Sequence, residues 1–301
     1  MIWFSRLPDH TRGILFMLAS VSAFSFMDAL AKMLGQRVDI SQVLLARYGG
    51  QLVVVLVLFG ASLRVIARTA HPYLQLLRAV LQLSAAGSFF IGLKSLGLAE
   101  ATAVGDLAPL FITLLAAVVL GEKVGPRRWA GIIAALFGAL LIIRPGTEVF
   151  TPQALWPLMA ALCLAGYAIV TRHIGTRESP MTALLYSGIF GTVMMGFVAP
   201  VRWVQPDGTA IWLMAAIGIV GTVGQLMMIR AYMSAPASSV APFSYAGLLT
   251  ATLWGVLFFG NWPDYWTVAG ALVIVGAGLY VWQREMRQPV AVAQEVGEGP
   301  R

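Results

Sequence analysis

The chain has 301 residues, of which 59% are hydrophobic and only 11% are charged, and its mean hydropathy is +0.81. Because a soluble domain carries about 25% charged residues, this chain has too little polar surface to face water, and lipid is the solvent that it fits. The net charge of +7 does not indicate nucleic-acid binding, since the basic residues sit in short clusters between apolar runs. The lone cysteine, Cys163, excludes an intrachain disulfide and a thiolate metal cluster, and no cofactor or metal is expected.

Ten apolar segments, separated by proline, glycine and charged residues, are predicted to cross the membrane as helices. About 20 apolar residues span the hydrocarbon core, and the runs do not alternate apolar and polar residues as barrel strands would. The predicted spans are 12–34, 40–61, 72–93, 99–120, 127–144, 152–172, 180–200, 209–232, 238–259 and 265–283. The predicted fold is an all-α integral membrane protein. Its first segment is expected to be an uncleaved span, because the apolar run is too long for a signal peptide and no A-x-A site closes it.

The basic residues of the loops predict the orientation. If the N-terminus is inside, the inner loops hold Arg6, Arg12, Arg64, Arg68, Lys123, Arg127, Arg128, Arg172, Arg177, Arg230, Arg284 and Arg287, and the outer loops hold Lys32, Arg37, Lys94, Arg144 and Arg202. This excess on the inner side indicates a multi-pass protein of the inner (plasma) membrane with both termini cytoplasmic. The polar residues 285–301 are expected to form a disordered cytoplasmic tail.

An internal repeat divides the chain. The stretch Ala99–Val104 returns as Ala235–Val240, 136 residues later. Each copy holds five predicted spans, and an odd number of spans forces the second copy to enter the membrane upside down. Inverted repeats of this kind are typical of secondary transporters, whose substrate site lies between the repeats near the membrane midplane. We expect a first repeat at residues 12–144 and a second, inverted repeat at residues 152–284.

Several stretches of the chain resemble the drug/metabolite transporter superfamily, and specifically its EamA type. The resemblance covers roughly residues 12 to 284. It is strongest at Leu98–Phe111, with Pro109 in the fourth helix, and continues through Leu120–Lys123 and Trp129–Gly131. The second repeat departs from the family pattern at Asn261, where glutamate is common. The resemblance implies two five-helix repeats and an inner-membrane carrier of small organic metabolites, often an exporter of amino acids.

A few polar side chains lie inside the predicted spans and are the candidates for a substrate cavity. A charged side chain at the bilayer centre costs on the order of 3 kcal/mol or more, so it usually faces a cavity or a partner. Asp28 and Lys32 can pair along one helix face, and Lys32 can alternatively snorkel to the interface. Arg47 is expected to be structural. The predicted cavity residues are Phe24, Asp28, Lys32, Gln82, Phe89, Asp106, Tyr167, Gln225 and Tyr245.

Two prolines and a tryptophan are predicted to act in gating. Pro109 and Pro242 can break the fourth and ninth helices, because proline removes a helical hydrogen bond. Trp254 is expected to cap the cavity. The glycines of the fifth and eighth helices are expected to allow close helix packing, and a homodimer through the fifth and tenth helices is an alternative use of such faces.

The predicted function is secondary transport by alternating access, most simply the export of amino acids, including aromatic and apolar ones. The alternative substrate class is a vitamin-like or nucleotide-derived metabolite taken up by the cell. An intramembrane enzyme is disfavoured, because His10, His71 and His173 lie outside the spans and no G-x-S-x-G, H-E-x-x-H or P-loop occurs. A channel is the remaining alternative of another class.

Overall fold

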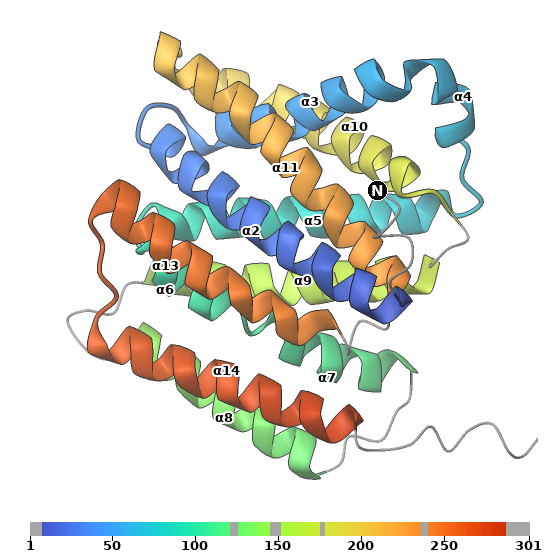
Figure 1. Ribbon diagram of the computed structural model, residues 1–301. Helices are drawn as coiled ribbons and strands as arrows, with labels where there is room; N and C mark the ends of the chain where they lie inside the picture. Colours follow the sequence, from blue (N-terminus) through green and yellow to red (C-terminus); the bar gives the residue numbers. More distant parts are fainter. Residues whose placement is uncertain (1–7, 121–125, 145–151, 175–177, 236–239, 287–301) are drawn as a thin grey trace, which may run out of the picture.

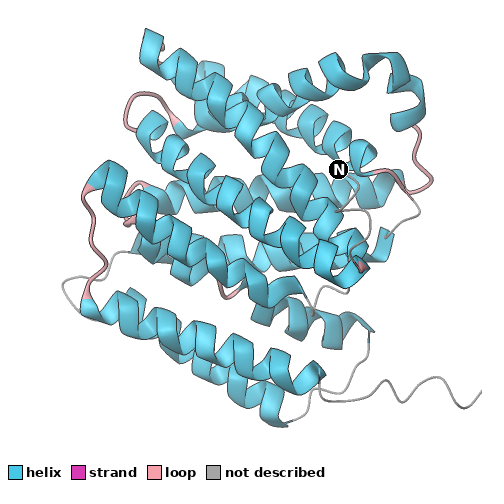
Figure 2. Cartoon of the chain, in the orientation of Figure 1, coloured by secondary structure: helices cyan, strands magenta, loops and turns pink. Residues whose placement is uncertain are grey.

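The computed structural model of the chain describes residues 8–120, 126–144, 152–174, 178–235 and 240–286, and these residues form helices and connections without any strand (Figure 2). The α-helices are α2 (Asp9–Gly35), α3 (Ile40–Phe59), α4 (Leu63–Ile66), α5 (Pro72–Leu93), α6 (Leu98–Gly105), α7 (Ala108–Leu120), α8 (Pro126–Ile143), α9 (Leu155–Ile174), α10 (Pro180–Val198), α11 (Gly208–Ser234), α13 (Ala246–Phe259) and α14 (Tyr265–Met286). The short 3-10 helices are η1 (Gly60–Ser62), η2 (Pro152–Ala154), η4 (Ala199–Arg202) and η5 (Ala241–Tyr245).

The helices account for the ten predicted spans. Within the described ranges, six helices are long and apolar enough to cross a membrane, and shorter apolar helices run over Trp129–Ile142, Phe243–Phe259 and Tyr265–Tyr280. The remaining span is the α6–α7 pair. We call the end of the bundle where α2 begins end A, and the end where α2 finishes end B.

The fourth span is not the continuous helix that was expected over 99–120. It is broken between α6 and α7 at Asp106 and Leu107, two residues before Pro109 on the chain. The ninth span is also irregular, since η5 contains Pro242 and precedes α13. The two interruptions occupy corresponding places in the two repeats, which is the arrangement expected of discontinuous helices beside a transport site.

Side-chain caps fix the starts of α3 and α11 at end B. The Asp39 carboxylate accepts hydrogen bonds from Ser41 N at 2.9 Å and Ser41 Oγ at 2.7 Å, and Asp207 accepts one from Ala210 N at 2.7 Å. Such caps satisfy backbone donors that the first helical turn leaves free. Burial opposes ionisation of Asp39, but the hydrogen bonds from Ser41 outweigh it and lower the pKa of Asp39.

Helix packing follows an approximate two-fold symmetry between the repeats. The long contact of α2 with α11 has its counterpart in α9 with α5, and the contact of α2 with α13 has its counterpart in α9 with α6 and α7. Two further contacts each join equivalent helices of the two repeats, so the symmetry exchanges the two helices of each pair. These pairs are α3 with α10, and α8 with α14. Figure 1 shows α8 and α14 side by side, apart from α3 and α10. The closest pairs therefore join helices of different repeats.

Glycines permit the closest of these crossings. A Cβ atom on Gly50 of α3 would lie 2.5 Å from the Cα of Gly218 on α11. Between α8 and α14, a Cβ on Gly138 would lie 2.8 Å from the carbonyl oxygen of Gly270. Small faces let helix backbones approach closely in lipid. The predicted small face of the fifth helix thus packs within the chain, against the tenth helix.

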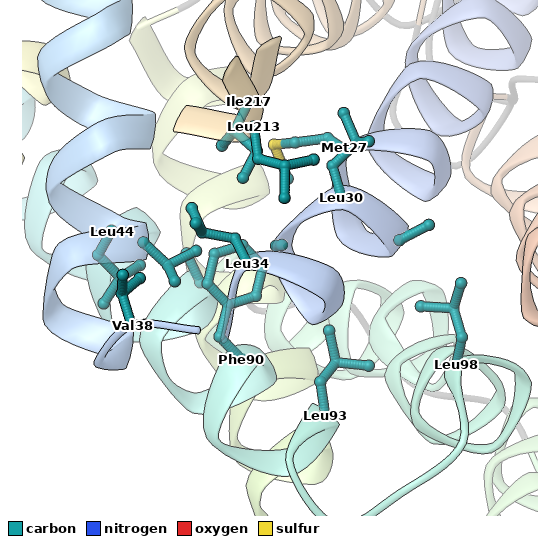
Figure 3. Close-up of a cluster of buried hydrophobic side chains, with 14 of the residues drawn as sticks. Met27, Leu30, Leu34, Val38, Leu44, Phe90, Leu93, Leu98, Leu213 and Ile217 are labelled. Atoms are coloured by element: carbon teal, nitrogen blue, oxygen red, sulfur yellow. The ribbon is translucent and has the colours of Figure 1, made fainter. Parts of the chain in front are cut away.

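Buried apolar side chains gather into a large cluster toward end B, where α2, α3, α5, α6 and α11 converge. Figure 3 shows Leu30, Leu34, Phe90 and Leu213 of this end-B cluster pointing toward one another. On α2 this cluster runs from Met27 to Leu34, toward end B. The predicted disordered tail begins within α14, which extends to Met286, and the rest of the tail falls outside the described residues.

Candidate functional site

A cavity of about 190 Å³ lies among the helices of both repeats, on the end-A side of the end-B cluster. Its wall is formed by α2, α5, α6, α7, α9, α11, η5 and α13, with one contribution from α3. On α2 the lining runs from Met17 to Asp28, about 16 Å along a helix axis. The cavity therefore occupies the central depth of the bundle. Helices α8, α10 and α14 contribute no residue to it within the described parts of the chain.

The structure brings together most of the side chains that were predicted to line a cavity. The predicted residues on its wall are Phe24, Asp28, Gln82, Phe89, Asp106, Pro109, Tyr167 and Gln225. On α5, the stripe Gln82, Ala85, Ala86 and Phe89 follows helical spacing, which explains why one face of the helix reaches the cavity. Their part in substrate binding stays a prediction.

The polar groups of the wall differ in how they are satisfied. Gln225 Nε2 donates a hydrogen bond to the Tyr167 hydroxyl at 2.6 Å, which joins α11 to α9. Gln82 Nε2 and Asp106 Oδ2 are buried and have no hydrogen-bond partner among the described residues. An unsatisfied buried polar group costs free energy, and these two atoms are available to pair with a molecule that enters the cavity.

Arg47 of α3 also lines the cavity, although it was expected to be structural. Its side chain is 8% exposed. The guanidinium Cζ lies 5.5 Å from the ring centre of Phe24, 5.6 Å from Tyr48 and 5.7 Å from Phe90. It is close enough to Asp28 to attract its charge, yet they form no ion pair within 4.0 Å in the described structure. The sequence places Arg47 within a predicted span, but it does not reveal the three aromatic rings that surround the guanidinium.

Four predicted residues are not on the described wall of the cavity: Lys32, Trp254, Tyr245 and Pro242. Lys32 Nζ donates to the carbonyl oxygen of Leu96 in the α5–α6 connection and lies 5.5 Å from the Phe259 ring centre, at end B. The expected Asp28–Lys32 pair is thus not formed among the described residues. Trp254 stacks on Phe258, with ring centres 5.4 Å apart.

Tyr245 faces away from the central cavity. It lines a second, apolar pocket beside α14, and its hydroxyl packs against Gly278, where an added Cβ would lie 1.9 Å away. Pro242 lies in η5. Tyr245 ends that same 3-10 helix, in which three residues rather than 3.6 complete a turn.

A chain of polar contacts extends from the cavity side toward end A. Gln75 and Arg78 are buried on α5, where Arg78 Nη2 donates to Gln75 Oε1. Gln75 Nε2 in turn donates to Glu178, which precedes α10. Arg78 also lies near the cavity residue Tyr167. Buried polar groups at membrane depth are thereby satisfied by each other, as lipid requires.

Comparison with known families decides the class of the protein. The model of the EamA-like transporter family matches residues 11–144 and 151–282. The chain belongs to the EamA-like transporter family. It is therefore a multi-pass membrane protein of a small-molecule transporter family, as the resemblance predicted.

Similar proteins are named as transporters of different compounds. The chain is 27% identical to the S-adenosylmethionine uptake transporter of Rickettsia prowazekii over 93% of this chain and 96% of that protein. It is 32% identical to the riboflavin transporter of Rhizobium johnstonii over 73% and 74%. It is 28% identical to the pseudopaline exporter CntI of Pseudomonas aeruginosa over 88% and 94%. A solved crystal structure matches with a TM-score of 0.65 at 20% identity, covering 92% of this chain and 99% of that one, which supports the fold alone.

Proposed function

We propose that this member of the family is a secondary transporter that carries a small zwitterionic metabolite across the inner membrane by alternating access. Amino acids with apolar or aromatic side chains are the leading substrates, and export is the leading direction. The observation that carries this proposal is the composition of the cavity wall. Carboxylates, a guanidinium and amides meet there with the rings of Phe24, Phe89 and Tyr167.

The physical reason is that each part of a zwitterion needs a different partner. Asp28 can attract an ammonium group, the free amide of Gln82 can donate to an acceptor, and the aromatic rings can bury an apolar side chain. A buried site that offers only one of these would leave part of such a substrate desolvated and unpaired. Both repeats contribute residues to the wall, which suits alternating access.

A second candidate is the uptake of a nucleotide-derived or vitamin-like compound. Two of the similar proteins are named for S-adenosylmethionine uptake and riboflavin transport. Aromatic side chains such as Phe24 and Phe89 can stack on a nucleobase or a flavin as well as on an amino-acid ring. The proposed orientation places end A and both termini in the cytoplasm. The proposed partners are the lipid bilayer and the small-molecule substrate, with no nucleic acid. A homodimer is an alternative to a single working chain.

The test is transport by the purified protein in liposomes. Counterflow is measured with labelled amino acids, S-adenosylmethionine and riboflavin, with and without a pH gradient. Saturable counterflow of an amino acid supports the leading proposal, and saturable counterflow of only S-adenosylmethionine or riboflavin supports the second candidate. Linear, non-saturating flux would instead favour a channel. No flux of any compound would contradict both candidates.

The cavity itself is tested with Gln82→Ala. We expect the apparent affinity of the transported compound to fall by on the order of tenfold, because one hydrogen bond to a charged group contributes about 1.5–3 kcal/mol. The matched control is Gln153→Ala, since Gln153 is exposed in η2, outside the cavity. Unchanged counterflow in Gln82→Ala would show that the substrate binds elsewhere.

A further inference from the structure

Arg47 is the one described cation on the wall of the central cavity, and its surroundings leave it incompletely satisfied. Phe24, Tyr48 and Phe90 stand 5.5 to 5.7 Å from its Cζ atom. Aromatic faces within about 6 Å attract a guanidinium through its charge. They accept few of its N–H donors, however, and those donors need oxygen acceptors.

No acceptor is supplied by the described residues. Neither a hydrogen bond nor an ion pair to the Arg47 guanidinium occurs in the described ranges, even though the side chain is 8% exposed. The other buried arginine of the core, Arg78, differs in this respect because it donates to Gln75 and does not line the cavity. The Arg47 nitrogens are not among the enclosed, unpaired side-chain atoms, so they open onto the cavity, where a ligand can supply the acceptor.

We propose that Arg47 binds the carboxylate of an α-amino carboxylate group and that Asp28 binds the adjacent ammonium of the same group. This inference rests on the proposed transport function and names the part of the substrate that is recognised. Guanidinium groups bind carboxylates through two parallel N–H···O bonds. Asp28 lies on the same wall, feels the charge of Arg47 and remains separate from it by more than an ion-pair distance. The pair can therefore receive opposite charges held next to each other on one ligand.

The rings also hold the guanidinium in place before the ligand arrives. Phe24 reaches Arg47 from α2, and Phe90 reaches it from α5, so helices on two sides of the cavity fix its position. A cation fixed in this way loses little side-chain freedom when it binds. Lysine has no planar fork and stacks less well, so it can keep the charge but not the two-point contact.

An α-amino carboxylate occurs in free amino acids and in S-adenosylmethionine, and paired probes distinguish these sources. Counterflow is measured in liposomes with L-phenylalanine against phenethylamine, and with S-adenosylmethionine against its decarboxylated form. We expect the protein to prefer the carboxylate-bearing member of at least one pair by on the order of tenfold or more, because a charge-assisted contact is lost in the other. Which pair shows the preference identifies the source.

Substitutions then assign the preference to Arg47. In Arg47→Gln we expect the preference to disappear while flux of the carboxylate-free member is retained, and in Arg47→Lys we expect part of the preference to return. Arg64→Gln removes one positive charge from the exposed helix α4 and serves as the matched control. Elution as a single folded species from a sizing column excludes misfolding as the cause.

Three results would overturn the inference. The first is counterflow of both members of each pair with equal affinity. The second is equal loss of both members in Arg47→Gln. The third is failure of both carboxylate-bearing compounds to be transported while riboflavin is. That last result would leave the transport function intact, whereas absence of any saturable flux would contradict the transport function itself.

Discussion

Gly49 and Gly50 are neighbours on α3 whose surroundings are entirely different. A Cβ on Gly50 would meet the backbone of Gly218 at 2.5 Å, whereas a Cβ on Gly49 would meet nothing within 4 Å. Backbone atoms cannot move aside as a flexible side chain can. We therefore expect Gly50→Ala to destabilise the protein by on the order of 1–3 kcal/mol, the usual cost of overpacking, seen as a lower Tm in detergent.

Gly49→Ala is the matched control for this prediction. It adds the same methyl group one residue away, and alanine favours a helix over glycine by about 0.5–1 kcal/mol. We expect its Tm to be unchanged or slightly higher. If the two variants melted alike, the close crossing of α3 and α11 would not contribute to stability.

Individual residues of the site were partly predictable from the sequence. Gln82 and Asp106 stand out as polar groups within apolar spans, and the cost of exposing them to lipid is enough to place them inside the bundle. The sequence shows that Arg47 lies within a membrane span. It does not show that Phe24 and Phe90 surround it, because those residues belong to other helices. Tyr245 lies on the second pocket and not on the described cavity wall, and the 3-10 helix that it ends could not be foreseen from the apolar sequence around it.

At the scale of elements, one carboxylate fastens two connections together at end A. Glu178, which precedes α10, accepts hydrogen bonds from Thr69 Oγ1, Gln75 Nε2, Ala70 N at 3.0 Å and His71 N at 3.2 Å. We call this set the Glu178 clasp. Burial opposes ionisation of the carboxyl, but the hydrogen bonds outweigh it, so the pKa of Glu178 lies below its usual 4.5.

The lowered pKa of Glu178 determines the direction in which stability changes with pH. The stabilisation by Glu178 is fully present above the usual pKa of 4.5 and is lost as the pH falls through the lower folded-state value. We expect Glu178→Gln to lower the Tm at pH 7, and the difference from the unsubstituted protein to shrink below pH 4.5. The measurement is a melting curve in detergent between pH 7 and about pH 3.5, a range that spans typical glutamate pKa values.

Asp9→Asn is the control for the Glu178 clasp. Asp9 is an exposed carboxylate at the same end that pairs with Arg12 on its own helix, and exposed pairs contribute about 0–1 kcal/mol. We expect little change in Tm at any pH. A constant difference between Glu178→Gln and the unsubstituted protein across the pH range would contradict the role given to the charge.

The helices themselves were more predictable than their interruptions. Long apolar runs are required by the thickness of the bilayer, so the predicted 72–93 coincides with α5, and 40–61 lies close to α3. The break at Asp106 was not predictable from hydropathy, because the residues on both sides of it are apolar. Only Pro109 gave a signal, and a proline does not say whether a helix will bend or stop.

At the scale of the whole molecule, the moving parts cannot be the two repeats taken separately. The most extensive contacts join α2 to α11 and α5 to α9, and each pair combines one helix from each repeat. The cavity lies between a group made of α2, α11 and α13 and its symmetry counterpart made of α5, α6, α7 and α9. We therefore expect these two mixed groups to move against each other during transport.

The contact of Lys32 with the Leu96 carbonyl crosses between those two groups at end B. If end B must open for a substrate to pass, a covalent link there will stop transport. We expect counterflow to be lost when Lys32→Cys and Leu96→Cys are joined by a bifunctional thiol reagent, in a Cys163→Ala background that removes the half-buried native thiol. The single variants, treated identically, show the effect of losing either side chain.

A second link at end B provides the decisive comparison. Arg144 and Asp264 form an ion pair between the two repeats, but they adjoin α8 and α14, which contribute nothing to the described cavity wall. Because the Gly138–Gly270 crossing holds these helices tightly together, we expect them to move as one body. Cross-linking Arg144→Cys to Asp264→Cys should therefore preserve counterflow. Loss of counterflow with this link as well would mean that the repeats separate along α8 and α14, and the division into mixed groups would be wrong.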